Sequence, residues 1–195
     1  MALIPNPLNK FRSYNYRWSL GVLSSSDLAN PSSYRSNGGN LLFIRSGGLP
    51  QKRIKTSIEE KLGINVEYFI DDVVIESIGN PNIQTSTSTA VTFEFTVTEP
   101  YSIGLFFQTL IIAANQGGYT NYIEAPYVLS VDFIGHTDND KIETTSRKSY
   151  AIKLTQVSLT ATGSGSVYKI NAIAWNHIGF LDDYQNLTKT IKCNL

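Results

Sequence analysis

The sequence predicts an α+β fold dominated by β-strands, an antiparallel sandwich or barrel with one main flanking helix at about residues 103–116. Several stretches alternate apolar and polar residues with period two, which is typical of strands with one buried face. One apolar run has helical spacing and ends at a double glycine. Strands and helices do not alternate along the chain, which argues against a parallel α/β sheet.

The first strand is predicted at Tyr14–Val22, where aromatic and aliphatic residues alternate with polar ones and define one aromatic face. Residues 24–40 are polar and rich in turn-forming residues, so we expect a loop with room for one helical turn near Asp27. A short strand is predicted at Leu41–Arg45, before a Gly-Gly-Leu-Pro break.

The next segments are less regular. Ser57 and Glu60 have the spacing of a capping box, which predicts a short helix at most between residues 51 and 63. The Val66–Ile78 region has strand composition, but adjacent apolar pairs interrupt the alternation and predict a bulge or burial on both faces.

Residues 88–135 form a strand–helix–strand unit. The alternation of Val91–Val97 predicts a strand that Pro100 ends, and Ser102 stands where it could cap the helix. A second strand is predicted around Leu129–Phe133.

A long hairpin is predicted to follow this unit. Its strands are expected at Tyr150–Ala161 and Val167–Trp175, and a glycine–serine turn joins them.

Composition limits the function classes. Sixteen basic and sixteen acidic residues cancel, so no strong field favours nucleic acid or an anionic membrane. The single Cys193 cannot form an internal disulfide, and the first residues lack a signal-peptide pattern. The longest apolar run, Ile103–Ala114, is too short to span a bilayer. We therefore expect production in a cytoplasm, with neither a specific nucleic acid nor a membrane as partner.

Catalytic and metal-binding patterns are weak. The segment of His136, Asp138, Asp140 and Glu143 lacks the glycine that a calcium loop has after its third ligand. Adjacent acids at 71 and 72 point to opposite sides of a strand.

Three further residues have side chains of the kinds used in catalysis. A carboxylate pair such as Glu94 with Asp132 could be united only by folding. His177 would need a nucleophile to act as a catalytic base, and the sequence has no Gly-x-Ser-x-Gly motif to supply one. We predict no enzyme, and no catalytic, cofactor-binding or metal-binding residues.

Four segments resemble a domain of structural proteins in tailed-bacteriophage virions, particularly tail or baseplate-hub components. They are residues 6–23, 98–115, 123–140 and 149–180, and they cover roughly half the chain. Their most distinctive pieces are Glu-Pro-Tyr at 99–101, Ala-Pro-Tyr at 125–127 with Asp-Phe at 132–133, and Asn-His at 176–177. Residues 24–65 match no part of this pattern.

The resemblance implies a tail-tube-like or hub-like structural protein of the virion, assembled in the host cytoplasm. Its partners would be copies of itself, in a ring-type homo-oligomer, and other tail proteins. We expect an N-terminal arm (1–13), a β-rich domain (14–180) and a C-terminal arm or the start of a further segment (181–195). The strand Tyr14–Val22 and the helix are the expected contact segments. The candidate assembly contacts are Tyr14, Tyr16, Trp18, Phe106, Phe107 and Tyr127.

Two other functions are compatible with the sequence. One is a carbohydrate-binding or receptor-binding module, because tyrosine and tryptophan rings can stack on sugars. The other is a phage tail hydrolase whose active site has no recognisable motif.

Overall fold

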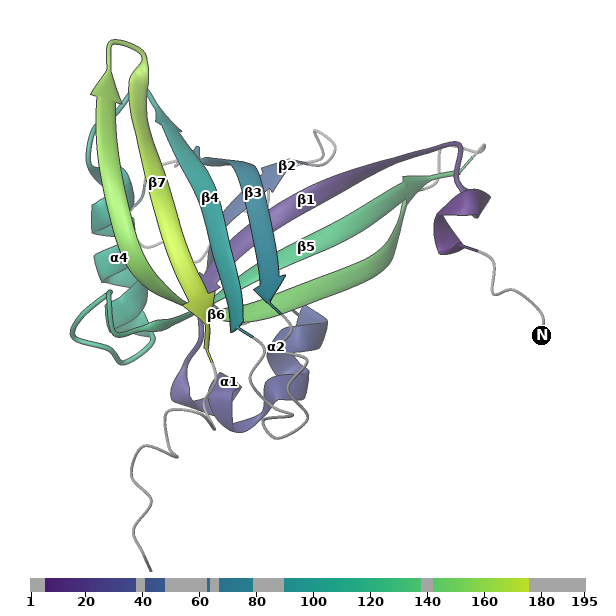
Figure 1. Cartoon of the computed structure of the whole chain (residues 1–195), viewed down its shortest axis with the longest axis horizontal. Helices are drawn as coiled ribbons and strands as arrows, with labels where there is room; N and C mark the ends of the chain where they lie inside the picture. The colour runs from purple at the N-terminus through teal and green to yellow at the C-terminus, as the bar shows by residue number, and fades with distance from the viewer. Residues whose placement is uncertain are drawn as a thin grey trace, which may run out of the picture.

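The computed structural model describes residues 6–37, 41–47, 63, 67–78, 90–137 and 142–175. They form one seven-stranded antiparallel sheet in the order β2-β1-β5-β6-β7-β4-β3 (Figure 1). The strands are β1 (Ser13–Val22), β2 (Leu41–Gly47), β3 (Phe69–Ile78), β4 (Ala90–Pro100), β5 (Pro126–His136), β6 (Ile142–Thr162) and β7 (Gly165–Ala174). The helical elements are η1 (Pro7–Lys10), α1 (Ser25–Ala29), α2 (Pro31–Asn37) and α4 (Leu105–Gln116). The predicted β-dominated α+β class is confirmed.

The long strand β6 joins two halves of the sheet. Its first part, Ile142–Lys153, pairs with β5, and its second part, Ile152–Thr162, pairs with β7. The ladder with β7 shifts register between Leu154 and Gln156, and such an extra residue bends a strand. Figure 1 shows β6 turning at the centre of the molecule, so that β1 and β5 run in a different direction from β7 and β4.

The two edge strands approach each other. The backbone N–H of Ile70 on β3 donates to the hydroxyl of Ser46 on β2 at 2.8 Å, and this bond is buried. The described residues form no backbone ladder between β2 and β3, so the predicted alternative of a closed barrel is not shown.

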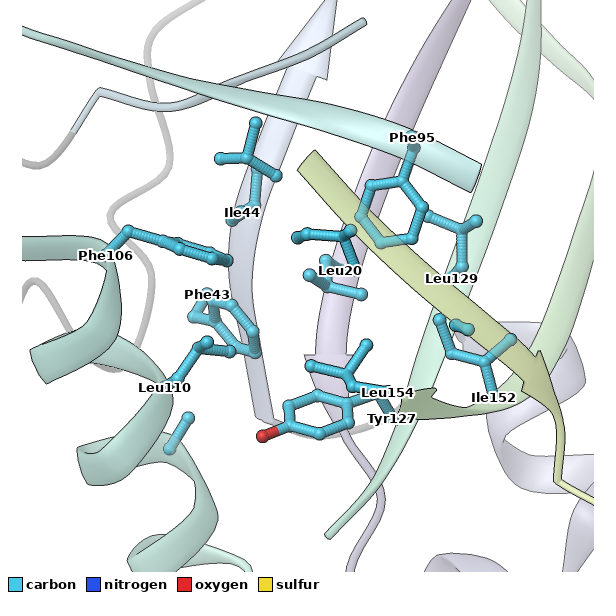
Figure 2. Close-up of a cluster of buried hydrophobic side chains, with 14 of the residues drawn as sticks. Leu20, Phe43, Ile44, Phe95, Phe106, Leu110, Tyr127, Leu129, Ile152 and Leu154 are labelled. Atoms are coloured by element: carbon cyan, nitrogen blue, oxygen red, sulfur yellow. The ribbon is translucent and has the colours of Figure 1, made fainter. Parts of the chain in front are cut away.

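The main core lies on the concave side of the curved sheet, between its two halves and α4 (Figure 2). Alternate residues of each strand supply it, since side chains in a strand point to opposite faces in turn. The largest fully buried side chains are Tyr127, Tyr168, Phe95, Phe106, Leu20, Leu23, Ile44, Leu110, Leu129, Ile152 and Leu154.

The helix α4 is fastened to the hairpin by a buried glutamate. Glu99, 1% exposed, accepts hydrogen bonds from the N–H groups of Leu105 and Phe106 at 3.2 and 2.8 Å. The hydroxyl of Tyr168 on β7 donates to the same carboxylate at 2.7 Å and accepts from the Gly104 N–H at 2.9 Å. A negative charge at a helix N-terminus is favourable because unpaired N–H groups and the helix dipole meet there.

The predicted cap at Ser102 is wrong, because the helix starts two residues later than expected. The N-cap is Gly104, whose φ of 86° lies in the left-handed region that glycine adopts without strain. Ser102 instead contributes its carbonyl, which accepts a hydrogen bond from the Ser166 hydroxyl on β7 at 3.0 Å. The carboxylate of Glu99, at the end of the preceding strand, thus caps the helix in place of the Ser102 hydroxyl.

The segment predicted as a loop at 24–40 contains the short helices α1 and α2. Ser24 and Asp27 form a complete capping box, in which each side chain binds the other residue's backbone N–H. Leu23 and Tyr34 pack with Val128 in a second small cluster. The expectation of a single turn underestimated this region, because burial of Tyr34 against the sheet adds stability that local sequence cannot supply.

Most other predicted elements are confirmed. The bulge expected in 66–78 appears between Asp71 and Val74, and Asp72 there has a φ of 51°. The hairpin of β6 and β7 turns at Gly163 and Ser164. The first half of β6 was not predicted. The short helix considered within 51–63 lies outside the described residues, apart from Gly63 in a turn.

Candidate functional site: an aromatic arm and a charged outer face

Three strands extend beyond the core as an arm, which we define as Ser13–Tyr16 of β1, residues 133–136 of β5 and residues 142–150 of β6. Strand β2 pairs with β1 only from Arg17 onward, and β7 pairs with β6 only from Ile152 onward. Within the described part of the chain, the arm therefore has two strand edges without a neighbour. Figure 1 shows it projecting away from α4, with η1 at its tip.

One face of the arm is aromatic. The side chains of Tyr14 and Tyr16 are 60% and 53% exposed, and Trp18 is half-buried against the core. Tyr16 pairs across the ladder with Phe133, and its ring lies 6.5 Å from the ring of Trp18 at 78°. These residues continue the row of Leu20 and Val22, so the face that forms the core at one end of β1 reaches solvent at the other.

Phe11 closes the tip of this face by lying on Gly135. A Cβ atom on Gly135 would overlap the Phe11 ring, so only glycine leaves the space that the ring occupies. The N–H of Arg12 continues the ladder by donating to the His136 carbonyl at 2.9 Å. The beginning of the described chain is thereby attached to the arm.

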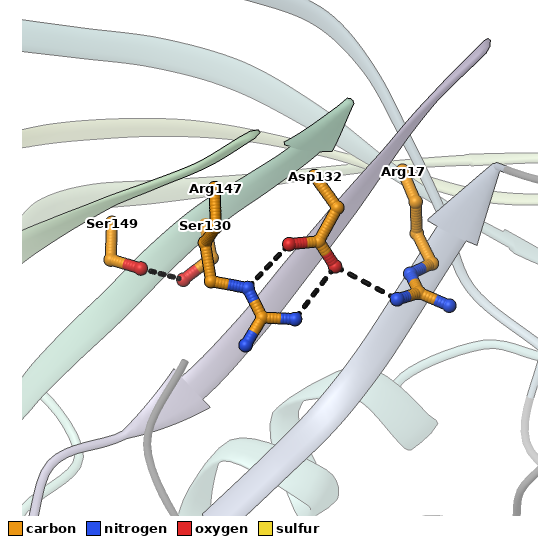
Figure 3. A network of polar contacts seen from close by, with 5 residues as sticks. All are labelled: Arg17, Ser130, Asp132, Arg147 and Ser149. Carbon is orange, nitrogen blue, oxygen red and sulfur yellow. Dashed lines mark hydrogen bonds and ion pairs between the residues drawn. The ribbon is translucent and has the colours of Figure 1, made fainter. Parts of the chain in front are cut away.

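The opposite, outer face carries a buried charge network (Figure 3). Asp132 on β5 is 1% exposed and lies directly between Arg17 of β1 and Arg147 of β6 in the ladders. Its Oδ2 accepts from the Nη2 atoms of both arginines at 2.8 Å, and its Oδ1 accepts from Nε of Arg147. Burial by itself raises the pKa of Asp132, but the hydrogen bonds and charges of Arg147 and Arg17 outweigh it and hold that pKa below its usual value.

The structure separates the six predicted contact residues into three groups. Tyr14 and Tyr16 are at the surface of the arm, and their contact role stays a prediction. Phe106 and Tyr127 are fully buried and so are not available to a partner in this conformation. Trp18 and Phe107 are half-buried, and the ring of Phe107 lies 5.3 Å from that of Tyr168. Tyr127 donates its hydroxyl to the Tyr122 carbonyl at 2.6 Å, and burial raises the pKa of Tyr127.

Among the described residues, the structure does not bring the candidate catalytic side chains together. Glu94 is exposed on β4 and pairs with Lys169 at 2.6 Å. Asp132 is on β5, which β6 and β7 separate from β4 in the sheet, and it is held there by two arginines. Asp71 and Asp72 are both exposed at the bulge. No group of three or more metal-ligating side chains occurs within the described ranges.

Asp138 and Asp140, together with His177 and Cys193, lie outside the described residues. Of the same loop segment, Glu143 pairs with Lys10 of η1 at 3.1 Å.

Sequence reasoning missed two polar centres, the carboxylates of Glu99 and Asp132. Asp132 stands on the polar side of its alternating strand, where a solvated charge is ordinary. Glu99 instead continues the apolar side of Val91–Val97, and this position is a local sign of burial. Their partners lie 69 and 115 residues away in the chain, at Tyr168 and Arg17. For Asp132, the signal in the sequence is that it stands within an otherwise uncharged run, Ala125–Gly135.

Comparisons of the chain with protein-family models, with curated proteins and with solved structures found no match. None of the described helices is both long and apolar enough to cross a membrane.

Proposed function

We propose that this chain is a structural component of a bacteriophage virion, in the tail or baseplate, which acts by symmetric self-assembly and by contacts with other virion proteins. The observation that carries the proposal is the arm, which has exposed aromatic side chains on one face and strand edges that no other described strand pairs with. Exposed edges and aromatic patches favour association, because a second chain can satisfy the backbone groups and cover the rings.

The resemblance described above supports the same proposal. Its four segments form β1, the Glu99 connection with α4, β5 and the β6–β7 hairpin, which together build most of the arm and of the core. The arm is the part of these elements that the chain's own core does not use. We infer that another copy or another virion protein covers it.

The test is to remove the aromatic rings without touching the core. The double substitution Tyr14→Ser and Tyr16→Ser should convert an oligomer into a 21.6 kDa monomer, measured by size-exclusion chromatography with light scattering and by electron microscopy. Both side chains are exposed, so the free energy of unfolding should change by no more than about 0.5 kcal/mol for each.

The matched control is Tyr101→Ser. Tyr101 is 95% exposed but lies between β4 and α4, away from the arm, and its loss should leave the mass unchanged. A wild-type chain that stays monomeric at high concentration would count against self-assembly.

A carbohydrate-binding or receptor-binding module is the second candidate. The observation that favours it is that Tyr14 and Tyr16 present two rings on one sheet face, as sugar-stacking residues do. A monomer that binds a glycan array, and loses binding in the double variant, would establish this function instead.

A further inference from the structure

The outer face of the sheet holds more positive charge than the fold requires. Arg17, Asp132 and Arg147 form one row across β1, β5 and β6. The neighbouring row, in register, consists of Arg45 on β2 and then Ser19, Ser130 and Ser149. Four adjacent strands therefore place three guanidinium groups around a single carboxylate.

Asp132 is already satisfied without Arg45. Its two oxygens accept three hydrogen bonds from Arg17 and Arg147, whose side chains remain 31% and 25% exposed. Arg45 is exposed and makes no hydrogen bond or ion pair with the described residues. The network thus carries two positive charges in excess, and the third arginine adds none of the bonds that hold it together.

The excess positive charge affects the pKa of Arg45. Its pKa is lowered, first by partial burial and then by the charges of Arg17 and Arg147, which together outweigh the attraction of Asp132. Like charges held this close repel one another, and they are tolerated most readily where an anion can neutralise them.

The donors are also of the right kind. A guanidinium group presents a planar fork of N–H donors that matches a carboxylate or phosphate. Nε of Arg17 is buried and has no hydrogen-bond partner among the described residues, so this arginine retains an unused donor. The row of serine hydroxyls lies directly beside these groups, with Ser130 donating to Ser149 at 2.9 Å.

From this arrangement we propose that Arg45, Arg17 and Arg147 form a binding site for an oxyanion, a carboxylate or a phosphoryl group, on the outer face of the sheet. Asp132 holds Arg17 and Arg147 in place, and Arg45 supplies the charge that the ligand neutralises. The site lies on the face opposite to Tyr14 and Tyr16, and it does not depend on the proposed role in a virion.

The experiment titrates the whole chain with sodium phosphate and, separately, with sodium succinate, at constant ionic strength set by sodium chloride. The melting temperature should rise by a few degrees and saturate, as expected for a ligand that binds the folded state alone. Saturation by phosphate alone identifies a phosphoryl site, and saturation by succinate, alone or as well, identifies a site that accepts carboxylates.

Two variants of Arg45 separate a site from a general charge effect. Arg45→Gln should weaken the apparent affinity about tenfold or more, which is the loss of one charge-assisted contact. Arg45→Lys keeps the positive charge but loses the planar set of N–H donors. Its affinity for the anion should therefore lie between those of wild type and Arg45→Gln. In chloride alone Arg45→Gln should melt no lower than wild type, because it removes repulsion.

Arg12→Gln is the matched control. Arg12 is exposed and immediately precedes β1. It is five residues from Arg17, or roughly 16 Å at the rise of a strand, so its loss should leave the affinity for the anion unchanged. The proposal is overturned if neither anion gives a saturable rise, or if Arg45→Gln and Arg45→Lys respond as wild type does.

Discussion

At the scale of single residues, Asp132 is a buried carboxylate that two arginines hold in place. A carboxylate that is 1% exposed is stable only if its hydrogen bonds and counter-charges replace the water it has lost. Arg17 and Arg147 do so from the strands on either side, which also fixes the register of β1, β5 and β6. A slip of one residue would move all three side chains to the face of the core.

Replacing Asp132 by Asn should therefore destabilise the fold. The arginines would face one another without a compensating charge, and we expect the free energy of unfolding to fall by about 2–3 kcal/mol, since both arginines are partly solvated. Chemical denaturation at pH 7 measures the change. Asp71→Asn, at an exposed carboxylate without an ion pair among the described residues, is the control and should have little effect.

The pH dependence of this difference has a defined sign. The pKa of Asp132 is lower in the folded state than its ordinary value, so its contribution is complete above the unfolded pKa of about 4 and is lost as the pH falls through the folded pKa. The gap between wild type and Asp132→Asn should narrow below about pH 4. A gap that stays constant down to pH 2 would contradict the assigned ion pairs.

At the scale of elements, Glu99 decides how α4 joins the sheet. The helix has no side-chain cap of its own at Gly104, and its first N–H groups bind a carboxylate at the end of β4. The same carboxylate receives the hydroxyl of Tyr168, and burial together with this hydrogen bond raises the pKa of Tyr168 to about 12. Strand, helix and hairpin are thus fixed through one side chain.

Glu99→Gln should loosen this junction. An amide offers one acceptor oxygen instead of two and lacks the charge that favours a helix N-terminus, so a buried N–H or hydroxyl loses its partner. We expect a loss of about 1–3 kcal/mol, or a fall in melting temperature of roughly 2–4 °C for each kcal/mol.

Glu94→Gln is the matched control for Glu99→Gln. It removes an exposed ion pair with Lys169 and should cost less than about 1 kcal/mol. Equal effects of the two substitutions would argue against a capping role for Glu99.

At the scale of the whole molecule, one antiparallel sheet bends around its own core until its edges meet at Ser46 and Ile70. Antiparallel sheets can curve in this way because bulges let a strand turn, and β6 carries one where the two halves join. What remains outside this enclosure is the arm, and its strand edges and tyrosines are the surfaces left for association.

The contact between the edges is open to a direct test. Ser46→Ala removes the acceptor of the buried Ile70 N–H, and an unsatisfied buried donor costs about 1–3 kcal/mol. Amide hydrogen exchange at Ile70 should accelerate, and the melting temperature should fall. Ser77→Ala, at an exposed serine of β3, should change neither quantity. Unchanged protection at Ile70 would show that the edges are held together by other contacts.

The sequence by itself determined the fold class, most strands, the helix α4 and the bulge in β3, because period two and helical spacing are local properties that burial imposes on the chain. It could not place the first half of β6, whose polar residues at 143–149 have no buried face to produce alternation. Nor could it tell that the face of Tyr14–Val22 is core at one end and surface at the other.

Only the tertiary structure decided these points, together with the partners of Glu99 and Asp132. Each depends on which strands are neighbours and in what register, and that follows from packing between segments far apart in the chain.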